Sequence, residues 1–291
     1  TVYTYRDREN LRNYRFSLLS NWTMLANERT KLEFLNLFNQ LAEDRTTLRT
    51  GRDVEAGNEV RNLAFRWQER SIYSGQLHGH HDLGAKNMII DWVAGYGRAS
   101  SSEPDYRRVR TTRPLTGSEA NAPFQMVIPP TASTNDAGRF YSELHESIYT
   151  GRVDAEKTLT SSNGAFVTKI KGGIFAELRD RDFSARWMSF AKANFTQFDN
   201  DLLYVAPGTA FSDANINTTT GFKLVEGTNP SDRYSASNAL LAAYAGSSFA
   251  FGKRYTVVAG VRAEQNRQQL ASARYNGARV SVDNAVLSVL P

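Results

Sequence analysis

The sequence predicts an all-β protein of long antiparallel strands, and three observations support this. Apolar and polar residues alternate with a period of two over most of the chain, as in strands with one apolar face. Helical periodicity is weak almost everywhere. The segments between turn-forming residues are also much longer than the usual strand of about five or six residues.

Composition narrows the class of protein. The chain has 291 residues, of which 41% are hydrophobic and 22% charged, so disorder is not expected. The absence of cysteine excludes a disulfide framework and a thiolate zinc site. The net charge is only +5 and arginines are interleaved with acids, so nucleic acid is not an expected partner. The sequence contains no apolar run of 18 residues, so a transmembrane helix is not expected. The first residues do not resemble a signal peptide.

The first half of the chain contains four predicted strands. The first covers 13–25, where apolar side chains alternate with polar ones. Residues 30–43 fit either a helix or a strand, because leucine and phenylalanine recur at both spacings; the strand-like neighbours favour a strand. Residues 58–82 form a long segment whose alternation slips around Glu69, as a β-bulge would cause. Residues 87–98 alternate again.

The second half contains four more predicted strands, over 139–160, 165–181, 233–249 and 255–270. In the last of these, one face stays apolar while the other becomes strongly polar. No turn residue interrupts the segment for about fifteen residues, beyond the usual strand length. A ninth strand is expected to start near the end of the chain.

The connections predict how the strands are arranged. Four are short: 26–30, 83–86, 161–164 and 251–254. Asn163-Gly164 is a two-residue hairpin signal. Four others are predicted as long polar loops: 42–57, 110–138, 192–232 and 271–283. Because short and long connections alternate, the long loops are expected together at one end of the sheet, although loops above about 12–15 residues are uncommon in compact domains.

This arrangement is typical of a transmembrane β-barrel, which has short periplasmic turns, long outer loops and strands that are apolar outside and polar inside. Only about 9–11 residues of such a strand cross the hydrocarbon, so a strand of about twenty residues projects beyond the membrane. The fold class is therefore an antiparallel barrel wall of about eight complete long strands. Trp22, Phe251 and Tyr255 are expected in the interfacial aromatic girdle.

Several stretches each match a known family pattern only weakly, but their order and spacing together are specific. They are NYRFSLLSNWTM with TKLEFLNLFNQ, WQERSIYSGQLHGHHDL, IIDWVAGYGRASSSEPDYRR, IKGGIFAELRDRDFSARW, and YSASNALLAAYAGSSF with YTVVAGVRAEQNRQQL. They span nearly the whole chain and resemble the barrel of a TonB-dependent outer-membrane receptor of the large SusC-like, carboxypeptidase-regulatory-domain-associated type. The resemblance implies a location in the outer membrane of a Gram-negative bacterium.

The resemblance implies an energised transporter that imports a siderophore, vitamin, glycan or peptide. Its implied partners are outer-membrane lipid, the receptor's own plug domain, the TonB energy-transducing complex and the nutrient, and no cofactor is implied. Receptors of this family have a barrel of about 22 strands. Residues 1–291 are therefore expected to be a partial barrel, with the plug domain, the signal peptide and the C-terminal strands absent.

Charged residues on the polar faces are candidates for the lumen. The candidates are Lys171, Glu177, Arg179, Arg181, Arg262, Glu264 and Asn266, with Arg186 expected in the same ladder as Glu177. They would contact a charged substrate or the plug, or form cross-strand ion pairs on a solvated wall, each worth a fraction of a kcal/mol. The solvated wall is the favoured interpretation.

Two other groups of residues are weaker candidates. His78 and His80 share a strand face and could begin a metal site, although a polar lumen face explains them as well. Four aromatic residues in the loop 192–232 could stack on a ligand or simply hold the loop in place: Phe195, Phe198, Tyr204 and Phe211.

Three further classes of function remain as alternatives. A passive porin or structural barrel would have strands closer to membrane length and a constricting loop in the lumen. A soluble sandwich would have shorter strands and two faces that suit a two-sheet core. An enzyme is not expected, because the sequence offers no nucleophile elbow and no carboxylate pair in an apolar setting.

Overall fold

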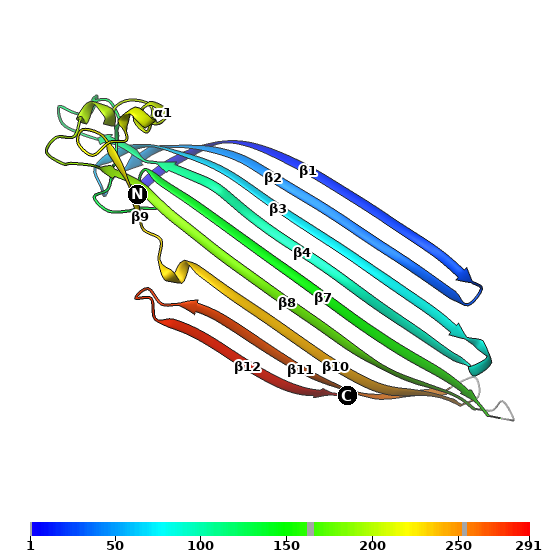
Figure 1. The fold of residues 1–291 in the computed structure, drawn as a ribbon. Helices are drawn as coiled ribbons and strands as arrows, with labels where there is room; N and C mark the ends of the chain where they lie inside the picture. Colours follow the sequence, from blue (N-terminus) through cyan, green and yellow to red (C-terminus); the bar gives the residue numbers. More distant parts are fainter. Residues whose placement is uncertain (1, 162–165, 252–254) are drawn as a thin grey trace.

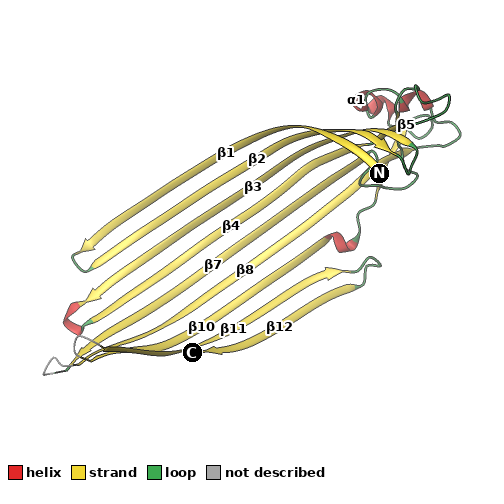
Figure 2. Ribbon diagram, turned by 180° about the vertical axis from the view of Figure 1, so that it is seen from behind, coloured by secondary structure: helices red, strands yellow, loops and turns green. Residues whose placement is uncertain are grey.

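The computed structural model describes residues 2–161, 166–251 and 255–291, and they form one antiparallel sheet (Figure 1). The side chain of Phe251 is also outside the described part. Along the sheet the strand order is β1-β2-β3-β4-β7-β8-β10-β11-β12. Figure 2 shows β1 and β12 at opposite edges. The predicted all-β, antiparallel fold is confirmed.

Eight long strands and a shorter ninth make up this path. Their bounds are β1 Tyr3–Asn27, β2 Thr30–Asp53, β3 Asn58–Leu83, β4 Met88–Val109, β7 Gly138–Thr160, β8 Phe166–Lys192, β10 Arg233–Phe251, β11 Tyr255–Ala273 and β12 Arg279–Leu290. The prediction of eight long strands and the start of a ninth is thus confirmed. No helix in the described ranges is long and apolar enough to cross a membrane.

The ambiguous segment 30–43 belongs to β2, so the helical alternative is wrong. Its backbone is paired with β1 on one side and β3 on the other over the whole segment. Two ladders satisfy every backbone group that a helix would have bonded internally. Leucines at helical spacing fall on both faces of the strand, which is tolerable where neither face is fully buried.

The pairing of β4 with each of its two neighbours contains one irregularity. The pairing of β3 with β4 shifts between Phe65 and Glu69, which confirms the predicted slip. The pairing of β4 with β7 shifts between Glu103 and Tyr106. Pro104 lies inside that second shift, where its missing N–H costs no ladder hydrogen bond.

Two of the four predicted long loops are wrong. β2 continues to Asp53, so only residues 54–57 connect it to β3. Likewise β11 continues to Ala273 and β12 begins at Arg279. Both stretches are rich in polar residues, so their sequence resembles a loop, yet most of each stays paired with a neighbouring strand. Strict alternation of short and long connections is therefore also wrong.

The other two long connections pack together as a cap at one end of the sheet (Figure 1). Their short elements are β5 Thr111–Pro114, β6 Gln125–Met126, η2 Asn200–Leu203, α1 Pro207–Ala210, η3 Asp213–Asn215, β9 Phe222–Glu226 and η4 Pro230–Asp232. A buried apolar cluster that includes Met126, Phe190, Phe198 and Phe222 holds the cap to the ends of β4 and β8.

The opposite end carries the short connections. β1 and β2 are joined through Glu28 and Arg29, and β3 and β4 through η1 Gly84–Lys86. The Asn163-Gly164 hairpin signal and the connection at 252–254 lie outside the described residues. The neighbouring strands β7 and β8, and β10 and β11, pair up to these points.

A glycine opposite a tryptophan provides a test of this register. Gly79 is paired with Trp92, whose indole occupies the space above the glycine, so a Cβ at residue 79 would overlap the ring. We expect Gly79→Ala to destabilise the full-length protein by about 1–3 kcal/mol through overpacking, measured by urea unfolding in detergent micelles. Gly151→Ala is the matched control, because a Cβ there meets nothing. Equal effects of the two variants would contradict the register.

Candidate functional site

The sheet has two chemically distinct faces, which the strand register defines. Directly paired residues project to the same side, so one side can be followed from Leu18 through Phe38 to Tyr73, and separately from Tyr96 through Tyr149 to Leu178. We call this side the apolar face and the opposite side the polar face. Away from the cap, neither face is covered by a second layer in the described structure, and Ile174, for example, is 61% exposed.

The apolar face carries a band of limited width. On β4 the band runs from Met88 to Tyr96 and stops at Arg98, and on β8 it runs from Ile170 to Leu178 and stops at Asp180. Each strand thus contributes about nine residues, which matches the 9–11 residues that cross a bilayer core. The strands themselves are 22 and 27 residues long, so more than half of each extends past the band.

Aromatic side chains mark the edge of the band nearer the cap. The rings of Tyr73 and Tyr96 lie 6.1 Å apart, and those of Tyr96 and Tyr149 lie 5.2 Å apart. The next residues outward are polar, and Ser71 and Ser100 form a 2.7 Å hydrogen bond. Such a row of tyrosines is typical of the boundary between hydrocarbon and water.

The edge near the short turns carries tryptophans. Trp22 lies on the apolar face with 69% of its surface exposed. Trp92 is on the same face and its Nε1 donates to His81 Nε2 at 3.0 Å. Tyr255 is 72% exposed near the start of β11. Trp22 and Tyr255, which were predicted to lie in the aromatic girdle, are therefore exposed enough to contact a membrane–water interface. The side chain of Phe251 lies outside the described part.

The band crosses the sheet obliquely, which gives the strand tilt. On β11 it ends at Ala263, and the line of paired residues from there leads across seven neighbours to Met24 on β1. On β1, however, the band continues to Tyr14, about ten residues beyond Met24. The edge of the band therefore shifts by about 33 Å along the strands while it crosses seven inter-strand spacings, or about 34 Å. This shift corresponds to a strand tilt of about 45° relative to the normal of the band.

The strand ends nearest the turns give a second measure. Thr30 is the first residue of β2. The line of directly paired residues from Thr30 crosses six strand pairs and reaches Val261, which lies six residues after the start of β11. This corresponds to a tilt of about 35°. Strands of transmembrane barrels tilt by about 35–45°.

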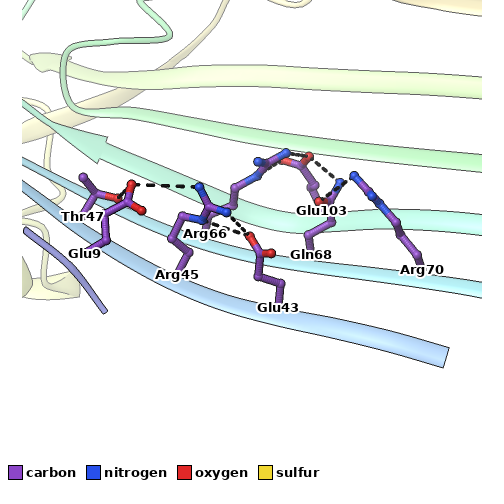
Figure 3. A network of polar contacts seen from close by, with 8 residues as sticks. All are labelled: Glu9, Glu43, Arg45, Thr47, Arg66, Gln68, Arg70 and Glu103. Atoms are coloured by element: carbon purple, nitrogen blue, oxygen red, sulfur yellow. Dashed lines mark hydrogen bonds and ion pairs between the residues drawn. The ribbon is translucent and has the colours of Figure 1, made fainter. Parts of the chain in front are cut away.

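The polar face carries ion pairs and hydrogen bonds across four strands, in the part of the sheet nearer the cap (Figure 3). Arg45 bonds Glu43 at 3.0 Å and approaches Glu9 at 3.9 Å. Arg66 donates from Nε to Glu103 at 3.1 Å, and its second nitrogen contacts the other carboxylate oxygen. We call this set, with Thr47, Gln68 and Arg70, the β1–β4 ladder.

A cavity of about 470 Å³ opens beside the β1–β4 ladder. Its charged lining includes Arg45, Arg66 and Arg108 together with Asp7 and Glu9. Glu103 is only 8% exposed, so the Arg66–Glu103 pair is the most enclosed part of the ladder. Sequence reasoning missed this pair, because the two residues are distant in the chain and only the register brings them together.

The seven predicted lumen residues all lie on the polar face, on β8 and β11. Glu177 and Arg179 pair at 3.2 Å, Arg181 donates to Glu146 at 2.5 Å, and Arg262 donates to Glu264 at 2.5 Å. The Oδ1 atom of Asn266 is buried without a partner in the described structure. Lys171 lines a cavity of about 720 Å³. Their contact with a substrate or a plug remains a prediction.

Arg186 does not belong to this ladder. Its even position puts it on the opposite face from Arg181, where it pairs with Glu226 at 3.0 Å. The expectation failed because a ladder along one face requires even spacing, and residues 181 and 186 are five apart.

The histidines are held by single polar partners. His78 Nε2 lies 3.0 Å from Gln76, and His80 Nδ1 lies 2.6 Å from Asp91. No group of three potential metal ligands is brought together within the described ranges. The arrangement therefore shows two separate hydrogen-bonded imidazoles on the polar face.

The four loop aromatics have different environments. Phe198 is 6% exposed inside the cap's apolar cluster, and Phe211 stacks on Phe190 with ring centroids 4.2 Å apart. These two hold the cap together. Phe195 is 67% exposed and Tyr204 49% exposed, so ligand contact stays a prediction for them.

Ion pairs near the cap lower the pKa values of their carboxyl groups. Arg49 hydrogen-bonds Asp7 at 2.8 Å and thereby lowers the pKa of Asp7. Burial alone would raise the pKa of Asp105, but hydrogen bonds from Arg139 and Arg107 outweigh it and lower that pKa. Both groups lie beyond the apolar band.

These lowered pKa values predict a pH dependence. A carboxyl group whose pKa is lower in the folded state stabilises the fold above its unfolded pKa of about 3.9, and this contribution is lost as pH falls toward the folded pKa. We expect the urea midpoint of the full-length protein to drop as pH falls below about 4, and Asp105→Asn to reduce that drop. An unchanged pH profile in Asp105→Asn would contradict this account.

The enclosed pair in the ladder predicts a second stability effect. Glu103→Gln removes the carboxylate that Arg66 and Gln68 contact and should cost about 1–3 kcal/mol. Glu226→Gln breaks an exposed pair with Arg186 and should cost less than about 1 kcal/mol. Chemical unfolding of both variants in the full-length protein checks the difference, and equal costs would argue against an enclosed ladder.

Comparison with known proteins finds likeness only among solved structures. No family model and no curated protein matches the chain. The crystal structure of the siderophore receptor PiuA from Acinetobacter baumannii is similar with a TM-score of 0.41 and 9% identity, over 99% of this chain and 44% of that one. The ferric-catecholate import receptor Fiu from K12 E. coli is similar with a TM-score of 0.44 and 11% identity, over 99% of this chain and 46% of that one.

The chain thus spans less than half the length of these two receptors. A likeness at this level does not transfer a function from one chain to another. The functional conclusion therefore depends on the two faces of the sheet.

Proposed function

We propose that residues 1–291 are part of the wall of a transmembrane β-barrel in the outer membrane of a Gram-negative bacterium, and that the barrel belongs to an energised receptor that imports a nutrient. The observation that carries the proposal is the apolar band on one face of the sheet. It is about nine residues wide, is bounded by tyrosines and follows the tilt of a barrel.

Lipid is the partner that this band suits. The band exposes residues such as Leu18, Ile174 and Leu241, each more than half exposed, and burial of apolar surface is worth about 25 cal/mol per Å². A second protein layer would serve the same purpose, but it would not require the band to end at one oblique line. Within lipid, every backbone group must be bonded inside the protein, which the paired strands achieve.

The polar face supports a wide, occupied lumen rather than a narrow pore. A closed eight-stranded barrel has an interior just wide enough for its own side chains. Here the ion pairs of the polar face form along the wall, as in the β1–β4 ladder, and cavities remain open beside them. We propose that a plug domain meets this face and that the TonB complex supplies the energy.

The passive porin receives less support from the cap. A porin-like barrel predicts a long loop folded against the polar face. In this chain Phe211 of the long connection after β8 stacks on Phe190, which projects from the apolar face. The strands β4 and β8, at 22 and 27 residues, are also more than twice as long as the part of each that carries the apolar band. The nutrient itself, whether siderophore, vitamin, glycan or peptide, is not specified by any contact in the sheet, and no enzymatic role is proposed.

Neighbouring positions on β8 test the membrane wall. The chain contains no cysteine, so Ile174→Cys on the apolar face and Phe175→Cys on the polar face can each carry a single nitroxide label. In the full-length protein in bilayers, with any other cysteines replaced, label 174 should be more accessible to oxygen and label 175 to a water-soluble nickel complex. Preference of both labels for the nickel complex would overturn the membrane wall.

Conductance distinguishes a plugged receptor from a porin. We expect the intact full-length protein to show no steady conductance in a planar bilayer, because the lumen is occupied. Mild urea, which loosens a separately folded plug first, should open it reversibly. A steady open pore without urea would favour the passive porin.

A further inference from the structure

In the part of β1 beyond the apolar band, acidic residues lie on one face of the strand and arginines lie on the other. Asp7 and Glu9 lie on the polar face, where Arg49 bonds Asp7 at 2.8 Å and Thr47 bonds Glu9 at 3.4 Å. The alternating residues Arg6, Arg8 and Arg12 lie on the other face. All three are exposed, and the described structure gives none of them an ion pair.

Arg12 is next to the apolar band, and the other arginines lie farther along the strands toward the cap. Arg12 is the first residue on this face beyond Tyr14, the outer end of the band on β1. Arg52 on β2 and Arg61 on β3 extend the group, because pairing places Arg6 and Arg61 on either side of Thr50. Both are exposed and also lack an ion pair in the part of the chain described. We call these five residues the outer arginine group.

Few carboxylates on the same face are available to the outer arginine group. Glu59, opposite Arg52, pairs with Arg113 at 2.6 Å. Glu69 accepts a 2.7 Å hydrogen bond from Trp67. Asp44 is paired opposite Arg12 in the ladder but makes no ion pair with it within the described residues. Asp44 and Glu69 make no ion pair within the described residues, so the five arginines outnumber the unpaired carboxylates on this face of β1, β2 and β3. Like charges on neighbouring strands destabilise each other.

We propose that the outer arginine group binds the phosphate-bearing headgroups of membrane lipids, an inference that rests on the proposed membrane wall. The group begins at the level where the apolar band ends, which is where lipid phosphates lie when acyl chains cover the band. Guanidinium groups bind phosphate through two parallel hydrogen bonds. A basic cluster beside a membrane-spanning surface is the expected complement of an anionic lipid.

The polar face of the same strands supplies a matched control. Arg15 and Arg70 both project to the polar face, where each is paired opposite Leu41, and both are exposed. Arg8→Gln/Arg12→Gln removes two positive charges from β1, and Arg15→Gln/Arg70→Gln removes one from β1 and one from β3. The two double variants differ in the face from which the charges are removed.

The test is native mass spectrometry of the full-length protein, extracted from outer membranes in mild detergent. Wild type should retain adducts with the mass of a phosphate-bearing lipid. Arg8→Gln/Arg12→Gln should lower their occupancy by about tenfold or more, since each basic residue at an anionic membrane surface contributes about fivefold in affinity. Arg15→Gln/Arg70→Gln should retain the adducts to within about twofold.

Other outcomes would overturn the inference at identifiable steps. Equal lipid retention by both double variants, or adducts with only the mass of inorganic phosphate, would exclude a lipid site while leaving the membrane wall intact. A protein that carbonate washing releases from the membrane would overturn the wall and the lipid site together.

Discussion

A backbone placed in hydrocarbon must bond all its N–H and C=O groups to other parts of the same protein. In this chain that constraint is met by strands paired with neighbours on both sides, from β2 to β10. The pairing also explains the length of the strands. Once a ladder has started at a short turn, it continues past the apolar band for as long as neighbouring strands remain available.

The same ladder gives each face its own chemistry. Because side chains alternate and directly paired residues share a side, a residue's parity along the strand decides whether it meets the apolar or the polar environment. Asp7 and Arg8 are neighbours in sequence, yet one forms an ion pair on the polar face and the other belongs to the outer arginine group. Function can therefore be assigned to a face before any ligand is known.

Sequence patterns predicted well what depends on alternation. The strands, the apolar face, the slip near Glu69 and the common side of Lys171 and Arg262 all follow from counting positions within one strand. The prediction was wrong where alternation fades. Residues 42–53 and 271–273 lie beyond the band, where the sequence no longer alternates between large apolar and polar side chains, and a stretch of this kind resembles a loop until its partner strand is known.

Specific side-chain contacts between paired strands were also beyond the reach of the sequence. The Arg66–Glu103 pair depends on a register that includes a bulge, and one extra residue in either strand would separate the two side chains. The roles of Phe198 and Phe211 depend on how two long connections pack against each other. A single sequence contains no periodic signal for such packing.

The most direct test of the central claim is the orientation of the strands in a membrane. Polarised infrared spectroscopy of the full-length protein in oriented bilayers measures the mean angle between strands and the membrane normal. The oblique apolar band and the positions of the strand ends predict about 35–45°. An isotropic signal, or strands lying in the membrane plane, would contradict a barrel wall whose apolar face meets lipid.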